Sequence, residues 1–104
     1  MTIKQAELES ILEEVGAAFG AVIEEVMPGV DAMEIVWSSK TVEFFGGEVE
    51  LFGVVLLAVH EYFQIPIQYD QYTEFDHFED LNDAITYIID GVLVKKGYKL
   101  DEIK

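Results

Sequence analysis

The chain has 104 residues, the size of one domain, and about half of them are hydrophobic, so a small core can form. Aspartate and glutamate number 21 against six lysines, no arginine is present, and the formal net charge is −15. Such a surface repels phosphate backbones and anionic membranes, so we expect no nucleic acid or membrane binding. It favours a basic protein partner, or it serves only to keep a small domain in solution. Because cysteine is absent, disulfides, thiolate catalysis and cysteine metal sites are excluded.

The sequence shows no targeting or membrane segment. Its first ten residues, MTIKQAELES, contain no basic region followed by an apolar stretch, so no signal peptide is expected. The longest unbroken apolar run, residues 54–59, is far too short to cross a bilayer. We therefore expect a single domain spanning residues 1–104 of a soluble, cytoplasmic protein.

Residues 5–27 predict a long helix that ends at Pro28-Gly29. Its apolar side chains recur at helical spacing, with glutamates on the opposite face. These apolar positions are Leu8, Ile11, Leu12, Val15, Ala18, Phe19, Val22, Ile23 and Val26. Gly16 and Gly20 weaken the helix but would allow a neighbouring element to pack closely.

Residues 30–47 are less regular and leave two interpretations open. The stretches MEIVWSS and TVEFF fit two short strands with Ser39-Lys40 in the turn, which would make an α+β domain with a 33–45 hairpin. They fit equally well a long loop that contains a helical turn. Residues 49–63 then predict a largely buried helix, because they are apolar on nearly all sides, and Pro66 disfavours helix at Ile65.

The last third of the chain predicts a short aromatic segment followed by a clear helix. Aromatic residues fall at intervals of three, which indicates short helical turns that place rings on the core: Tyr69, Tyr72, Phe75 and Phe78. Acids between them argue against stacking on nucleobases. The final helix has a clear apolar stripe: Leu81, Ala84, Ile85, Ile88, Ile89, Val92 and Leu93. Asp80 or Asp76 can cap its start, and Lys95 and Lys96 suit its end before Gly97. The order of elements predicts an all-α, antiparallel four-helix bundle with a long first connection.

Residues with catalytic or metal-binding chemistry are sparse. His60 and His77 have no spacing typical of a metal site, and each is expected at or near the surface. No calcium loop or phosphate-binding glycine loop is present. The serines, Ser10, Ser38 and Ser39, have no histidine nearby in the sequence. We therefore expect no enzyme, no cofactor and no metal.

One segment resembles the modification site of acyl carrier proteins, which are small acidic four-helix bundles. In that family an acid and a Leu-Gly pair precede Asp-Ser-Leu at the start of the second helix. The serine receives a phosphopantetheine arm, which holds an acyl chain as a thioester. The segment VEFFGGEVELFGVVLLAVHEYF is similar without a gap: Glu43 stands for the acid, Phe45-Gly46 for Leu-Gly, and Glu48 for the aspartate. Ile65-Pro66 and LNDAITYI at residues 81–88 resemble later family signals, so the resemblance covers roughly residues 30–91.

The sequence departs from the family at the residue that carries the chemistry. Val49 occupies the position of the serine, and a valine side chain has no hydroxyl to modify. A slip of one residue would match Leu51 to the family leucine but would place Glu50 at the serine position, which also cannot be modified. Ser38 and Ser39 come about ten residues too early. The resemblance therefore implies a degenerate carrier-like protein without the arm.

The same resemblance implies a partner-binding face on the second helix, which in carriers docks basic enzymes. The predicted site has an apolar centre and an acidic rim: Val49, Leu51, Val54 and Leu57, with Glu48, Glu50 and Glu61. If exposed, the apolar residues would form an interface; if the helix is rotated or covered, they belong to the core. The partner would be a basic or apolar-faced protein of fatty-acid or polyketide-type biosynthesis, or a second copy of the chain. An alternative function is an acidic inhibitor or immunity-type protein that masks a basic site.

Overall fold

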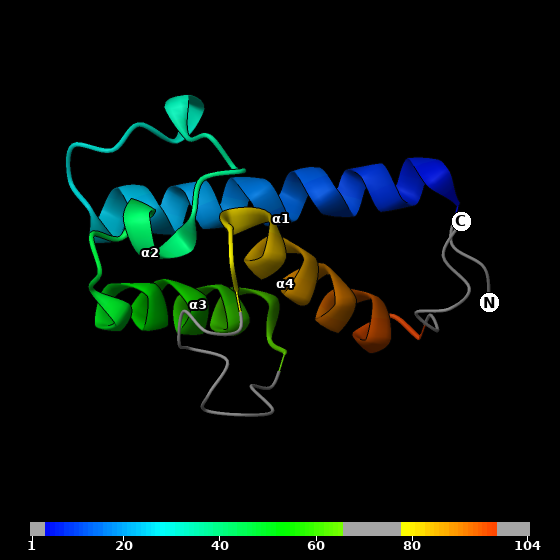
Figure 1. Ribbon diagram of the computed structural model, residues 1–104. Coiled ribbons are helices and arrows are strands. Elements are labelled where there is room, and N and C mark those ends of the chain that lie inside the picture. Colours follow the sequence, from blue (N-terminus) through cyan, green and yellow to red (C-terminus); the bar gives the residue numbers. More distant parts are fainter. Residues whose placement is uncertain (1–3, 66–77, 98–104) are drawn as a thin grey trace.

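The protein is described by a computed structural model, which covers residues 4–65 and 78–97. Four α-helices and one short 3-10 helix follow each other along these residues (Figure 1). They are α1 (Gln5–Val26), η1 (Ala32–Glu34), α2 (Thr41–Phe44), α3 (Val49–Phe63) and α4 (Leu81–Lys95). The described residues contain no β-strand, which confirms the all-α class. The alternative hairpin at residues 33–45 is wrong, because this span contains the end of η1 and all of α2.

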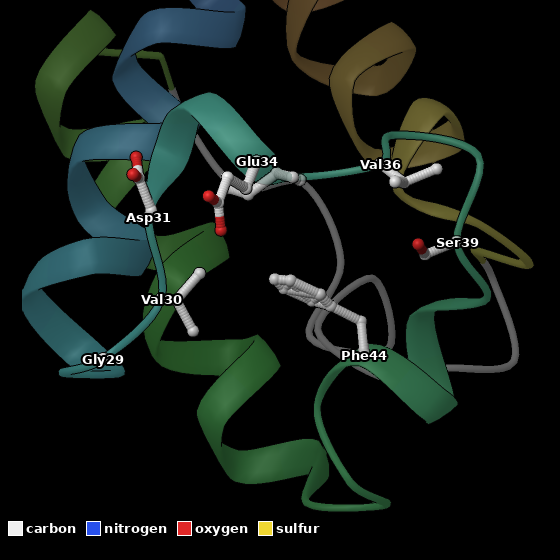
Figure 2. A pocket seen from close by; sticks show the side chains of 8 residues that line it. Gly29, Val30, Asp31, Glu34, Val36, Ser39 and Phe44 are labelled. Atoms are coloured by element: carbon white, nitrogen blue, oxygen red, sulfur yellow. The ribbon is translucent and has the colours of Figure 1, made fainter.

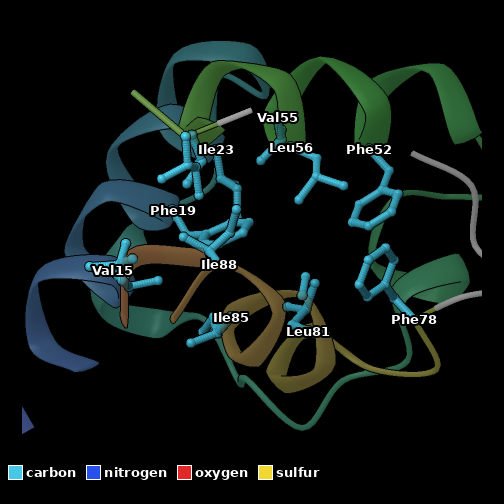
Figure 3. Close-up of a cluster of buried hydrophobic side chains, with 14 of the residues drawn as sticks. Val15, Phe19, Ile23, Phe52, Val55, Leu56, Phe78, Leu81, Ile85 and Ile88 are labelled. Atoms are coloured by element: carbon cyan, nitrogen blue, oxygen red, sulfur yellow. The ribbon is translucent and has the colours of Figure 1, made fainter. Parts of the chain in front are cut away.

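The core lies where α1, α3 and α4 meet (Figure 3). Its most completely buried side chains come from all three helices and from the turn before α3: Val15, Ile23, Phe45, Phe52, Val55, Leu56, Val59, Ile88 and Leu93. The predicted apolar faces of α1 and α4 are largely confirmed, but Leu12 is half exposed. The prediction that α3 is largely buried is wrong for one of its faces, since Val54 and Leu57 are exposed.

A close contact holds the connection after α1 against that helix. An added Cβ at Gly20 would lie 3.0 Å from Cβ of Ala32, so a larger residue would crowd η1. The Ala32 backbone N–H also donates to Oε2 of Glu24 at 2.8 Å. The close packing expected from the glycines is therefore confirmed at Gly20, whereas a Cβ added at Gly16 would meet no atom of another element within 4 Å.

Backbone hydrogen bonds tie the start of α4 to the segment before α2. The N–H of Leu81 donates to the carbonyl of Ser39 at 3.1 Å, and the N–H of Asn82 donates to that of Trp37 at 3.0 Å. The first N–H groups of a helix have no partner within the helix, so this segment satisfies two of them. Asp80 and Asp83 satisfy others through a reciprocal capping box, which confirms Asp80 as the cap.

The aromatic segment before α4 lies mostly outside the described residues. Tyr69, Tyr72 and Phe75 belong to that part, so the short helical turns predicted there stay a prediction, as does the arrangement of the complete bundle. Phe78 is described and is buried, with its ring centroid 5.4 Å from that of Phe52 (Figure 3). This single ring agrees with packing of the aromatic residues on the core.

Thr41, the first residue of α2, provides a stability prediction. Its side chain is fully buried, and its hydroxyl has no hydrogen-bond partner in the described part of the chain. An unsatisfied buried hydroxyl costs about 1–3 kcal/mol, so Thr41→Val should raise the free energy of unfolding by roughly 1 kcal/mol in urea denaturation. Thr41→Ser, which keeps the hydroxyl and loses a methyl group, should lower it. A less stable Thr41→Val protein would show that the hydroxyl is satisfied.

Candidate protein-interaction surface

The turn between α2 and α3 is built by two consecutive glycines. Gly46 and Gly47 both have positive φ, 62° and 79°, which favours glycine at each position. Their N–H groups donate to the carbonyls of Glu43 and Val42 at 3.2 and 2.8 Å, which closes the C-terminal end of α2. Phe45, just before them, is buried with its ring centroid 5.4 Å from that of Phe52. This motif therefore anchors α2 to the core and sets where α3 begins.

Val49 is the first residue of α3 and is exposed, with 37% of its surface accessible. The position that resembles the attachment serine thus lies at an accessible helix start, but its side chain is a hydrocarbon. Glu48 precedes it as the N-cap and makes no side-chain capping hydrogen bond. Ser38 and Ser39 precede α2, so neither lies at the start of α3.

The exposed face of α3 has an apolar pair with an acid on each side along the helix. Val54 and Leu57 are 50% and 48% exposed, and Glu50 and Glu61 are exposed one helical turn away on either side. Residues three or four apart on a helix are neighbours on its surface, so these four share one face.

Val49 and Leu51 lie on opposite flanks of this face, so the four predicted apolar residues do not form one stripe. An α-helix turns by about 100° per residue, so Val49 and Leu51 point to sides about 160° apart. Leu51 is half-buried and packs against the core, on one flank of the Val54–Leu57 pair. Val49 lies toward the other flank, beside the exposed Glu48. We call Glu50, Val54, Leu57 and Glu61 the α3 face; it has two apolar residues where four were predicted.

The basic residues of the described chain lie away from the α3 face. No lysine occurs between Lys40 and Lys95, so none is on α3. Lys40 forms an ion pair with Glu79, and this hydrogen bond and charge raise the pKa of the Lys40 ammonium. Lys95 donates to the carbonyl of Phe63 at 3.0 Å, beyond the end of the face. The α3 face therefore has two acids and no lysine of its own.

His60 is buried, with 3% exposure, so the expectation of a surface or boundary position is wrong. Its Nδ1 lies 2.7 Å from the Leu56 carbonyl, which can only accept, so Nδ1 carries the proton. The neutral ring then accepts at Nε2 from the hydroxyl of Tyr87 on α4, at 3.2 Å. Burial lowers the pKa of His60, and the Leu56 hydrogen bond opposes this. The ring joins α3 to α4 as a neutral, satisfied group; His77 lies outside the described residues.

Other features of the described residues bear on ligands and membranes. They contain no group of three acidic or histidine side chains placed to hold a metal ion. They also contain no helix both long and apolar enough to span a membrane. Two surface cavities formed by described residues lie away from the α3 face. One of about 430 Å³ lies where α3 and α4 end, beside Tyr62 and Lys96. The other, of about 330 Å³, lies between η1 and α2 and is lined by residues such as Glu34 and Phe44.

The cavity beside η1 was not predicted from the sequence, because its walls come from segments that sequence periodicity does not relate. An acid placed among apolar residues, as in MEIV, was the available signal.

Comparison of the chain with known protein families, with curated proteins and with solved structures finds no match. The resemblance to carriers therefore rests on the residues and the layout described above.

Proposed function

We propose that this protein is an acyl-carrier-like protein that cannot hold a phosphopantetheine arm and that binds another protein through the α3 face. The observation that carries the proposal is the pairing of an exposed valine at the start of α3 with an exposed apolar pair further along it. The layout of a long first helix, a long connection, a glycine turn and a second main helix agrees with the carrier plan.

The absence of an arm follows from the chemistry of the start of α3. A phosphodiester to the arm needs a hydroxyl, and neither Val49 nor Glu50 has one. The accessible helix start can still meet a protein surface. The role that remains is to bind or hold a protein, in biosynthesis of the fatty-acid or polyketide type.

The α3 face indicates the chemistry of that partner. Complete burial of an exposed leucine-sized side chain contributes about 1.5–3 kcal/mol. About half of Val54 and of Leu57 is still exposed, so the two together can supply roughly that amount to binding. Glu50 and Glu61 at the ends of the pair favour basic groups at the rim and steer their approach. A second copy of the chain fits less well, because it would bring another strongly acidic protein against this face.

The alternative function, an acidic inhibitor of a basic protein, is favoured by one observation. The charge of −15 is spread over the whole chain, and acids are exposed on α1 as well as α3. Binding of that kind would use many charges at once and would weaken steeply with salt. It would depend little on two apolar residues.

Leu57→Asp separates these functions when it is compared with Leu12→Asp. Both leucines are about half exposed, at 48% and 50%, but Leu12 is on α1. We expect Leu57→Asp to weaken partner binding at least about tenfold, since it replaces buried apolar surface with a charge. Leu12→Asp should leave binding unchanged. The measurement is quantitative affinity purification of the wild type and both variants from the native cells, at low and high salt.

The outcomes of this experiment are distinct. A protein retained by the wild type and Leu12→Asp, and lost from Leu57→Asp, supports the α3 face. Equal retention by both variants, with loss at high salt, contradicts it and supports the acidic inhibitor. Light scattering of the purified protein decides the remaining case, since a dimer dispersed by Leu57→Asp would identify a second copy as the occupant.

A further inference from the structure

The cavity between η1 and α2 combines apolar walls with a carboxylate. Its volume is about 330 Å³, at the lower end of the range for small-ligand sites. The walls come from the connection after α1 and from α2: Gly29, Val30, Asp31, Glu34, Ile35, Val36, Ser39 and Phe44. Figure 2 shows the Glu34 carboxylate directed into the space between Val30 and Phe44, and the Phe44 ring extending toward Val30.

The two acids of the cavity differ in what they do. Asp31 caps η1, since its Oδ1 accepts from the Met33 N–H at 2.9 Å. Figure 2 shows its carboxylate directed away from the space beside Phe44. Glu34 is exposed, and its carboxylate makes no hydrogen bond or ion pair within the described residues. The nearest lysine along the chain, Lys40, is paired with Glu79. A cation in this cavity would therefore meet the Glu34 carboxylate.

We propose that this cavity receives an arginine side chain from a basic partner protein. A guanidinium is planar, so it can stack on the Phe44 ring while its N–H groups donate to the Glu34 carboxylate. The aliphatic part of arginine fits against Val30, Ile35 and Val36, which are half-buried or exposed and apolar.

Charge complementarity selects this occupant over others. An anion would meet the Glu34 carboxylate and be repelled by it, and a purely apolar group would leave Glu34 beside it without a partner and partly desolvated. A metal ion needs several converging ligands, and no such group exists among the described residues. The contact lies between η1 and α2, so it is separate from the α3 face and is independent of the function proposed above.

The test uses two small amides with the full-length protein in heteronuclear NMR titrations. N-acetyl-arginine methylamide is the probe, and N-acetyl-citrulline methylamide is its uncharged control of nearly the same shape. We expect the arginine amide to shift resonances of Val30, Ile35 and Phe44 in a saturable way, with a Kd on the order of 1–10 mM. The citrulline amide should bind at least about tenfold more weakly, because it lacks the charge.

Matched variants separate this cavity from general attraction to an acidic surface. Glu34→Gln should weaken binding of the arginine amide about tenfold, whereas Glu13→Gln, at an exposed site on α1, should leave it unchanged. Equal binding of both amides, unchanged binding to Glu34→Gln, or shifts spread over exposed acids instead of the cavity would each overturn the proposal. So would the absence of any saturable shift.

Discussion

Replacement of Phe52 by alanine is expected to remove about 3–5 kcal/mol of stability. Phe52 is 1% exposed and lies between two other buried rings, with centroid distances of 5.4 Å to Phe45 and 5.4 Å to Phe78. These rings join the turn before α3 to α3 itself and to the segment before α4. Since a small domain has a total stability of about 5–15 kcal/mol, the midpoint of thermal unfolding should fall by about 15 °C or more.

Leu57→Ala on the same helix is the control for this prediction. Leu57 is 48% exposed on the opposite side, and exposed substitutions change stability by about 0.5 kcal/mol or less. Circular dichroism melting of both variants measures the contrast. Equal losses of stability would contradict the orientation of α3, and Leu57 could not then serve as a free surface for binding.

His60 is expected to make stability fall as the pH drops below about 6.5. Burial lowers the pKa of His60 in the folded protein below its ordinary value of 6.5, so the unfolded chain binds this proton more readily. The contribution of neutral His60 to the free energy of unfolding is complete above pH 6.5, and it is lost as the pH falls below that value. The loss can reach about 1.4 kcal/mol per pH unit until His60 also protonates in the folded protein.

The measurement compares the wild type with His60→Gln, which cannot titrate. Acidification also reduces the repulsion among the acids. It protonates Asp90 as well, whose carboxyl has a raised pKa because burial disfavours its charged form. Both effects act on the two proteins alike, so the difference in unfolding free energy isolates His60. This difference should shrink as the pH falls. It should also shrink in a Tyr87→Phe background, since burial is the main cause of the lowered pKa of His60. Parallel curves for the two proteins would contradict a buried, neutral His60.

The three long helices could be predicted from the sequence because each carries its own local signals. α4 shows this best: its apolar spacing, the Asp80 cap and the terminal lysines agree, and the helix occupies residues 81–95. The 30–47 connection could not be assigned, because its fold depends on contacts distant in sequence. The hydrogen bonds from Leu81 and Asn82 to the carbonyls of Ser39 and Trp37 have no local signature.

The candidate site was predictable in part. Helical spacing placed Val54 and Leu57 on one face, but an apolar sequence cannot show which side of a helix meets the core. The single stripe predicted for Val49, Leu51, Val54 and Leu57 therefore divides, with Leu51 half-buried on one flank and Val49 exposed on the other. His60 was misplaced for a related reason, because its burial depends on the Leu56 carbonyl and on a hydroxyl 27 residues away in the sequence. The cavity beside η1 depends wholly on the fold of the connection.

The most direct test of the central claim is the intact mass of the protein after incubation with coenzyme A and a phosphopantetheinyl transferase. A true carrier protein in the same reaction is the positive control. The wild-type mass should stay unchanged, because Val49 at the start of α3 offers no hydroxyl. A gain of one phosphopantetheine group on the wild-type protein would contradict the claim that this carrier-like protein cannot carry.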